Sequence, residues 1–259
     1  MPVFQIIPDP LHLEESIALA EEYGLGFEYN DFFSPQVLTD EKKCDELIAR
    51  YEGIKVPGPV TSHGDFFDVL VFSEDEEIRR ISLKRIRQSL EISERLGAVG
   101  TVFHSNISPH LYSDLYTNAW TDRNEECWRA VCGEFPHQQI WLENMFDSDP
   151  VRLKVLAERL KDVENFGLCF DYAHANCFGA AHDIDEWAKT LAPYTKHVHI
   201  NDNDGVMDLH KPVGEGQIDW YGFKRHLEEH MSDASVLVEN TGVEAQKISL
   251  QYLKKLGLL

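Results

Sequence analysis

CFDYAH at residues 169–174 and KHVHIND at residues 196–202 are two short apolar runs that end in side chains able to bind a metal ion. Successive side chains of a strand point to opposite faces, so Asp171 and His199 can face one interior while their neighbours pack outward. Two strands that end in this way predict one shared site.

The same alternation of short β-type runs and longer amphipathic runs extends along the chain. The apolar runs predict strands at residues 3–7, 26–29, 60–63, 99–104, 140–145, 166–170, 198–200 and 236–238. The amphipathic runs predict helices at residues 11–23, 40–51, 75–96, 122–135, 184–192, 220–231 and 243–256, and one more that opens at Asp149 and Pro150. Residues 105–122 and 201–219 are predicted to be long loops, which in compact domains are commonly functional or disordered.

Eight strand–helix units with continuously apolar strands are typical of a parallel sheet buried on both faces. Eight is also the number of units that closes a (β/α)8 barrel. The alternative, an open doubly wound sheet, would need a glycine-rich phosphate loop after an early strand, and neither GxGxxG nor GxxxxGK(S/T) follows a strand here. We therefore predict an α/β fold, a (β/α)8 TIM barrel, formed as a single domain by residues 1–259.

The composition restricts the partners and the compartment. Asp and Glu number 45 against 24 Lys and Arg, and the formal charge of −21 repels phosphate backbones and anionic membranes, which disfavours a nucleic-acid partner. Five cysteines without CxxC spacing favour free thiols in a reducing compartment. No basic and then apolar leader opens the chain and no run approaches membrane-spanning length, so we expect a cytoplasmic protein with no membrane contact.

Polar side chains gather at the carboxyl ends of the predicted strands, where a barrel places its chemistry. Taken alone, each such histidine or glutamate is more commonly an ordinary polar residue or loop cap. Together they predict a site, and their mixture of imidazole and carboxylate suits zinc, manganese or iron, whereas calcium would favour oxygen ligands alone. They are His63, His104, Glu143, Asp171, His174, His199 and Glu239 at strand ends, and Asp208 and His210 in the loop after the seventh strand.

The strand ends and following loops carry the motifs TSHG (61–64), FH (103–104), LEN (142–144), FDYAH (170–174), HIND (199–202), DLH (208–210), GEG (214–216) and VEN (238–240). In this order they resemble the xylose isomerase-like barrel superfamily, over nearly the whole chain. That superfamily includes sugar and sugar-phosphate isomerases and epimerases, and the type IV apurinic endonucleases.

The resemblance implies one to three divalent ions, zinc or manganese, and assigns their ligands. The central site shared by epimerases and endonucleases would be formed by Glu143, Asp171, His199 and Glu239. The endonuclease branch adds a second ion, held by His63, His104 and a bridging Glu143. It also adds a third ion, held by His174, Asp208 and His210.

Two reactions are compatible with such a site. In a sugar or sugar-phosphate isomerase or epimerase, Glu143 and Glu239 exchange a proton beside a polarised carbonyl, through an enediolate. In a multi-zinc phosphoesterase of the type IV apurinic endonuclease kind, several ions activate water. A non-catalytic metal-dependent binding module is a third option. We expect the first reaction, on a small-molecule sugar or sugar phosphate. The substrate, the metal, the number of ions and the oligomeric state are left open, and a homo-oligomer is one option.

Two further features are candidates for substrate binding. In the loop at residues 211–216, glycines would let the backbone approach a ligand, and Lys211 and Glu215 would contact it; the equal alternative is a turn that leads into the helix at 220–231. Four aromatic residues are candidates for an apolar wall on which a sugar stacks, although for each taken alone ordinary packing is the more common role. These residues are Phe32, Phe33, Trp120 and Trp141.

Overall fold

The computed structural model describes residues 2–111, 113–179 and 183–259. Eight strands form a closed barrel in chain order, and each pairs in parallel with the next until β8 pairs with β1. The strands are β1 Phe4–Ile6, β2 Gly26–Tyr29, β3 Val60–His63, β4 Gly100–His104, β5 Gln139–Glu143, β6 Phe166–Asp171, β7 Thr195–Ile200 and β8 Ser235–Val238. The predicted TIM barrel is confirmed, with strand ends shifted by a few residues at most; the assignment of residues 1–259 to one domain stays a prediction.

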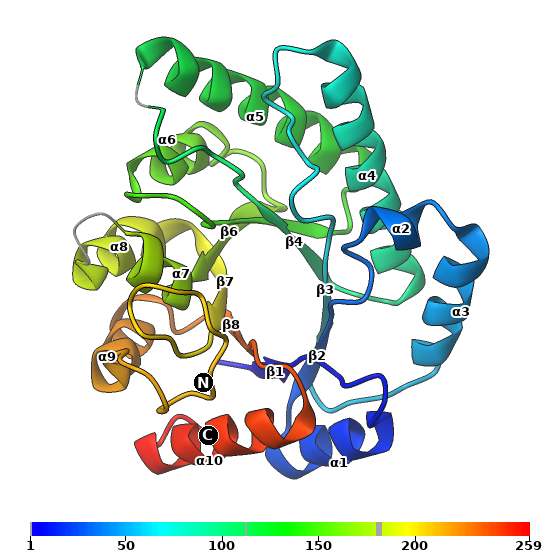
Figure 1. Ribbon diagram of the computed structural model, residues 1–259, viewed down its shortest axis with the longest axis vertical. Helices are drawn as coiled ribbons and strands as arrows, with labels where there is room; N and C mark the ends of the chain where they lie inside the picture. Colours follow the sequence, from blue (N-terminus) through cyan, green and yellow to red (C-terminus); the bar gives the residue numbers. More distant parts are fainter. Residues whose placement is uncertain (1, 112, 180–182) are drawn as a thin grey trace.

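The helices surround the strands on the outside of the barrel (Figure 1). They are α1 Leu13–Tyr23, α2 Pro35–Leu38, α3 Glu41–Tyr51, α4 Glu76–Arg95, α5 Asp114–Glu134, α6 Val151–Arg159, α7 Tyr172–Phe178, α8 Ile184–Leu191, α9 Trp220–His230 and α10 Val243–Leu256. Side-chain caps fix several starts; Asp75, for example, accepts a hydrogen bond from the backbone of Glu77 at the start of α4. Within the described ranges, none of the helices has both the length and the apolar character needed to cross a membrane.

The predicted loop at residues 105–122 is wrong in its second half. Helix α5 begins at Asp114, because the Ser113 hydroxyl accepts a hydrogen bond from Tyr116 N and caps the helix. The short helices α2 and α7 were not predicted, since each is shorter than the window in which helical periodicity becomes visible. At α6, Asp149 accepts from Val151 N as expected, but Pro150 lies before the first helical residue.

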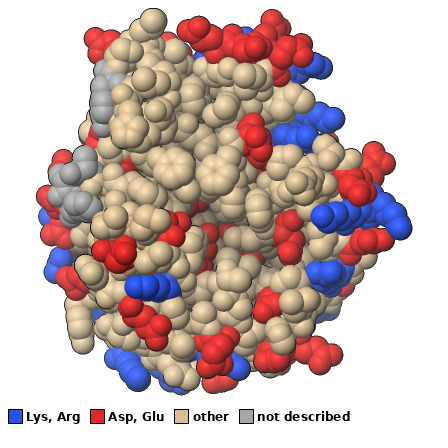
Figure 2. All heavy atoms as spheres, viewed as in Figure 1, with Lys and Arg blue, Asp and Glu red and all other residues tan. Residues whose placement is uncertain are grey.

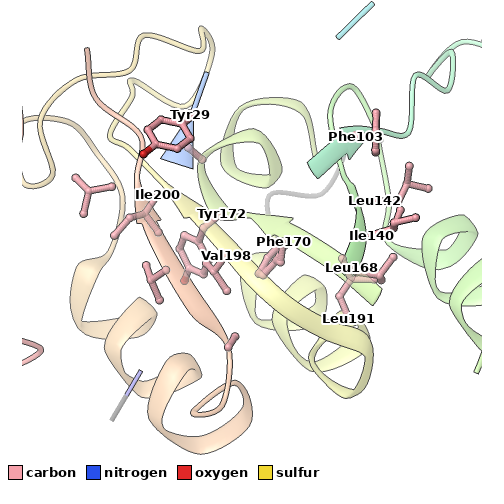
Figure 3. Close-up of a cluster of buried hydrophobic side chains, with 14 of the residues drawn as sticks. Tyr29, Phe103, Ile140, Leu142, Leu168, Phe170, Tyr172, Leu191, Val198 and Ile200 are labelled. Carbon is pink, nitrogen blue, oxygen red and sulfur yellow. The ribbon is translucent and has the colours of Figure 1, made fainter. Parts of the chain in front are cut away.

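The main core lies between the strands and the helices. Figure 3 shows part of it, where Phe170 of β6 and Val198 of β7 lie in one buried cluster with Leu191 of α8. Side chains alternate along a strand, so an outward Phe103 or Phe170 leaves the next residue, His104 or Asp171, pointing into the barrel. The packing of the outer face thereby places the polar strand ends inside the mouth.

Candidate metal centre

Four side chains from four neighbouring strands meet at the carboxyl end of the barrel. Glu143 and Asp171 are the last residues of β5 and β6, His199 lies on β7, and Glu239 follows β8. His199 Nδ1 lies 3.4 Å from Glu143 Oε1 and 3.9 Å from Glu239 Oε2. Ligand atoms of Asp171, His199 and Glu239 all lie within 4.8 Å of one another. The structure therefore brings the four predicted central residues together.

Each of these four residues turns towards the others one buried polar atom without a hydrogen-bond partner among the described residues, and His199 has a second such atom, Nε2, which lies 3.3 Å from Glu28 Oε1, itself unpaired. The four atoms are Glu143 Oε1, Asp171 Oδ2, His199 Nδ1 and Glu239 Oε2. Buried polar atoms are almost always paired, so four unpaired ones facing each other need an explanation. A divalent cation would satisfy all four, and three carboxylates with one imidazole are a donor set that suits zinc, manganese or iron. The residues present fit a metal ion.

The charges of these four residues lead to the same conclusion. Burial raises the pKa of Asp171 to about 8. The charge of His174 opposes this rise, and the charges of Glu143 and Glu239 add to it. Burial would also raise the pKa of Glu143, yet the charge of His199 and hydrogen bonds from His174 and His199 outweigh it and lower this pKa well below its usual range. Without a cation, the carboxylates are balanced only by protons on their neighbours.

A second and a third cluster adjoin the central one. Nε2 of His63 and Nε2 of His104 lie 3.3 and 3.5 Å from Glu143 Oε2, so the two oxygens of Glu143 face different clusters. Burial lowers the pKa of His104 to about 3, which keeps this imidazole neutral. In the third cluster, Asp208 Oδ2 lies 3.4 Å from His174 Nε2 and 2.9 Å from His210 Nε2. All nine predicted residues meet at the mouth; their roles as ligands stay predictions.

Three of the histidines are oriented by backbone carbonyl groups. In each, Nδ1 contacts a carbonyl oxygen and Nε2 faces a carboxylate, although Nδ1 of His174 also lies 3.3 Å from Glu143 Oε1 and Nδ1 of His210 lies 3.8 Å from Glu239 Oε2. The pairs are His63 with Gly64 O at 3.1 Å, His174 with Asn144 O at 2.9 Å and His210 with Glu239 O at 3.1 Å. Such a contact fixes the proton on Nδ1 and frees Nε2 as a ligand. His210 also has a φ of 45°, which is uncommon for a residue with a side chain.

Sequence reasoning missed Glu28 of β2, a fully buried carboxylate below the site. Its Oε2 accepts a hydrogen bond of 2.8 Å from Thr61 and lies 3.1 Å from His197 Nε2, while its Oε1 lies 3.3 Å from His199 Nε2. The signal was present in the sequence as a glutamate inside the strand GFEY, all four residues of which are buried. Local pattern gave no indication of the strands that this carboxylate would face.

The loop that carries Lys211 and Glu215 is fixed by Asp202. Backbone atoms of Lys211 and Asp202 pair in an antiparallel bridge, and the Asp202 carboxylate accepts from Gly214 N at 2.9 Å and Trp220 Nε1 at 2.7 Å. Lys211 is half-buried and Glu215 is exposed. The contacts of Asp202 thus account for the turn that leads into α9. The roles of Lys211 and Glu215 in binding substrate stay predictions.

Of the four aromatic residues considered for an apolar wall, three have the ordinary packing role that was favoured at each position taken alone. Phe32, Trp120 and Trp141 are 1%, 0% and 5% exposed and belong to the packed interior. Phe33 does reach the surface, where its ring stacks on Phe66 at 4.2 Å, and the Phe66 ring packs edge-on against His63. Other phenylalanines join it around the histidines and form a phenylalanine rim, which consists of Phe33, Phe66, Phe67, Phe146 and Phe178.

Viewed into the mouth, the molecule has a central hollow with acidic side chains within it (Figure 2). Lys and Arg side chains lie mostly near the periphery of this face. The hollow therefore suits a cation and a ligand with polar groups, and its surroundings offer apolar and acidic contacts rather than a basic surface.

Similar proteins include a probable endonuclease and an epimerase-like protein. An uncharacterized protein of Methanocaldococcus jannaschii, MJ1311, is 29% identical over 217 residues, which cover 81% of this chain and 72% of the relative. A probable endonuclease 4 of Halorhodospira halophila is 26% identical over 190 residues, or 65% of this chain and 62% of the relative.

Solved structures align over almost the whole chain. The TTHB071 protein of Thermus thermophilus, from a crystal soaked with ZnCl2, is 26% identical with a TM-score of 0.78 and covers 99% of this chain and 98% of its own. A D-tagatose 3-epimerase-like protein is 26% identical with a TM-score of 0.72, over 98% of both chains. The family model described as xylose isomerase-like TIM barrel matches residues 17–256, and the chain therefore belongs to this family.

Proposed function

We propose that the protein is a divalent-metal-dependent isomerase or epimerase of a small sugar or sugar phosphate, acting by proton transfer through an enediolate. The observation that carries the proposal is the set of four unpaired donor atoms on Glu143, Asp171, His199 and Glu239. These residues would hold the central ion. A divalent cation supplies a Lewis acid that polarises the carbonyl and hydroxyl oxygens of a bound sugar.

Glu143 and Glu239 are the proposed acid and base. They approach the mouth from β5 and from the end of β8, so they can reach a bound carbon from different sides. The ionised carboxylate takes the proton from a carbon beside the carbonyl, the C–H electron pair becomes the carbon–carbon double bond of the enediolate, and the π pair of the carbonyl moves onto its oxygen until the carbon is reprotonated. The other, protonated carboxyl returns a proton to the opposite face, which inverts that carbon and leaves the two carboxyls with exchanged protonation states.

The surroundings of the site favour a sugar over a nucleic acid. The net charge of −21 opposes a polyanion, whose binding depends largely on Lys and Arg. Phe33 and Phe67 of the phenylalanine rim are 39% and 56% exposed and offer flat apolar faces for the C–H side of a sugar ring. Five buried free thiols support a reducing compartment, and we propose a cytoplasmic location.

A multi-zinc phosphoesterase of the type IV apurinic endonuclease kind is the second candidate. It is favoured by the two additional clusters, in which His63 and His104 share Glu143 and Asp208 lies between two imidazoles. The similarity to a probable endonuclease 4 supports it as well. Three occupied ion sites would be the natural use of all nine residues.

One experiment separates the candidates. Protein loaded with manganese, and separately with zinc, is incubated in deuterium oxide with a panel of ketoses and ketose phosphates, and in parallel with a duplex that contains an abasic site. We expect deuterium at the carbon beside the carbonyl of at least one sugar and no strand cleavage. Cleavage of the duplex without exchange into any sugar would replace the isomerase by the phosphoesterase.

A further inference from the structure

His199 differs from the other histidines of the centre in what orients it. His63, His174 and His210 turn Nδ1 towards a backbone carbonyl and Nε2 towards a carboxylate, although Nδ1 of His174 also lies 3.3 Å from Glu143 Oε1. Among the described residues, neither ring nitrogen of His199 has a hydrogen-bond partner of this kind. Its Nδ1 faces Glu143 and Glu239, and its Nε2 faces the carboxylate of Glu28 at 3.3 Å. A side chain thus stands where the others have a carbonyl group.

The environment of Glu28 holds its carboxylate in this place. The Thr61 hydroxyl donates to Oε2 at 2.8 Å, and Thr61 Oγ1 in turn accepts from Gln5 Nε2 at 2.9 Å. On the other side, His197 Nε2 lies 3.1 Å from Oε2, and the His197 ring is stacked on Trp141 with 4.8 Å between ring centroids. His197 Nδ1 is bonded to Ser235 Oγ at 2.6 Å. Glu28 is therefore fixed between two imidazoles inside the barrel, one layer below the mouth.

We propose that Glu28 is a positioning residue, which holds the proton of His199 on Nε2 and so presents Nδ1 to the central ion. The inference rests on the metal site of the proposed function. An ionised carboxylate only accepts hydrogen bonds, so the ring nitrogen that faces it carries the hydrogen. Outer partners of this kind orient a metal-binding histidine and typically alter metal affinity by about 10–100-fold when they are removed.

A competing interpretation makes the same residues a separate ion site. Ligand atoms of Cys169, His197 and His199 also lie within 4.8 Å of one another. In that case His199 would bind an ion through Nε2 and not through Nδ1. The contacts of Nε2 with Glu28 and of Nδ1 with the carboxylates of the mouth favour the orienting role, and the two interpretations predict opposite positions for the proton on the ring.

The first test is a zinc titration of the metal-free protein against a chromogenic chelator. Glu28→Gln keeps the shape of the side chain but loses the charge and one acceptor. We expect the dissociation constant of the central zinc ion to rise by about 10–100-fold. The matched control is Asp147→Asn, which changes another buried carboxylate whose partners are Ser105 Oγ and Met145 N; it should bind zinc as wild type does. Zinc affinity of Glu28→Gln equal to that of wild type would overturn the role of Glu28 and leave the metal site standing.

The second test needs no variant, so it holds even if Glu28→Gln does not fold. Two-bond proton–nitrogen correlations of zinc-loaded wild type identify the protonated nitrogen of His199. We expect a proton on Nε2 and zinc on Nδ1. Zinc on Nε2 would overturn the proposal in favour of an ion between Cys169, His197 and His199. A wild-type protein that binds no zinc or manganese at all would remove the proposed function together with this inference.

Discussion

The two ends of the barrel treat buried polar groups in opposite ways. Before β6, at the amino end, the side-chain amide of Asn165 donates to the carbonyl oxygens of Cys132, Phe135 and Gln138, at 3.2, 3.0 and 3.0 Å. In the last residue of β6, at the carboxyl end, Asp171 Oδ2 has no hydrogen-bond partner among the described residues. The first arrangement stabilises the fold, whereas the second is destabilising without a cation and is useful only for chemistry.

Removal of the metal should have the largest effect, and only at the carboxyl end. Treatment with a chelator is expected to abolish deuterium exchange into the sugar, because proton abstraction then lacks the polarised carbonyl. The barrel should stay folded, since its strands are joined by parallel backbone pairing around the full circle. Exchange rate and far-ultraviolet circular dichroism check both statements, and addition of manganese or zinc should restore the rate. A chelated protein that keeps its full rate would show that the mouth works without an ion.

Asp171→Asn should separate the ligand role of this residue from its structural role. The Asp171 carboxylate also caps α7 by accepting from His174 N at 2.6 Å, and asparagine is an equally good cap. Metal affinity should fall by about 100-fold or more, because a direct ligand is lost and outer partners already account for about 10–100-fold. Helix content should be unchanged. Calorimetric titration with zinc and circular dichroism measure the two effects, and an unchanged affinity would remove Asp171 from the central site.

Asp147→Asn should change the pH dependence of stability without changing the metal centre. Burial raises the pKa of Asp147 from 3.8 to about 6 in the folded protein. A raised carboxyl pKa contributes stability that is full below the unfolded value and is lost as pH rises through the folded value. Between pH 4 and pH 7, the unfolding free energy of metal-free wild type should therefore fall relative to the variant by about 1–3 kcal/mol. Urea unfolding of both proteins at several pH values measures this difference. The same pH dependence of the unfolding free energy in wild type and variant would contradict it.

Asn165→Ala should act on the amino end alone. Three carbonyl oxygens lose a shared donor, which should lower the unfolding free energy by about 1–2 kcal/mol, since the site is only partly buried and water can replace some of the bonds. Zinc affinity and the exchange rate should match wild type. A clear loss of metal affinity in this variant would show that the two ends are coupled more closely than the comparison implies.

The strands were predictable because their cause is local. A buried strand is a short run with aromatic or β-branched residues, and GFEY at residues 26–29 and VTSH at residues 60–63 have the predicted bounds. The start of α5 could not be predicted. Ser113 and the polar residues that follow it resemble a loop, and the burial of Trp120 and Asn124 that identifies the helix is visible only in the folded structure. Helix caps can be read from sequence, but the tertiary burial that selects among them cannot.

In the site too, what depends on local sequence could be predicted and what depends on tertiary contacts could not. The meeting of the strand-end residues could be predicted because a barrel brings every strand end to one mouth, whatever the side chains are, and the loop after β7 adds Asp208 and His210. Glu28 could not, since its importance depends on His197 and His199, about 170 residues away in sequence and brought near only by closure of the barrel. Packing was the favoured role of Phe32, Trp120 and Trp141 and is what the structure has, because a large aromatic side chain gains most from burial.

The most direct test of the proposed proton transfer compares wild type with Glu239→Gln, each with its metal content measured, by deuterium exchange from solvent into a ketose. Glutamine keeps one ligand oxygen but loses the charge and the basicity that move a proton from carbon. The matched control is Glu244→Gln, the same change at an exposed position in the first turn of α10. We predict that exchange falls by about 100- to 10,000-fold in Glu239→Gln and is unchanged in Glu244→Gln. A Glu239→Gln protein that holds its metal and exchanges as fast as wild type would contradict the account.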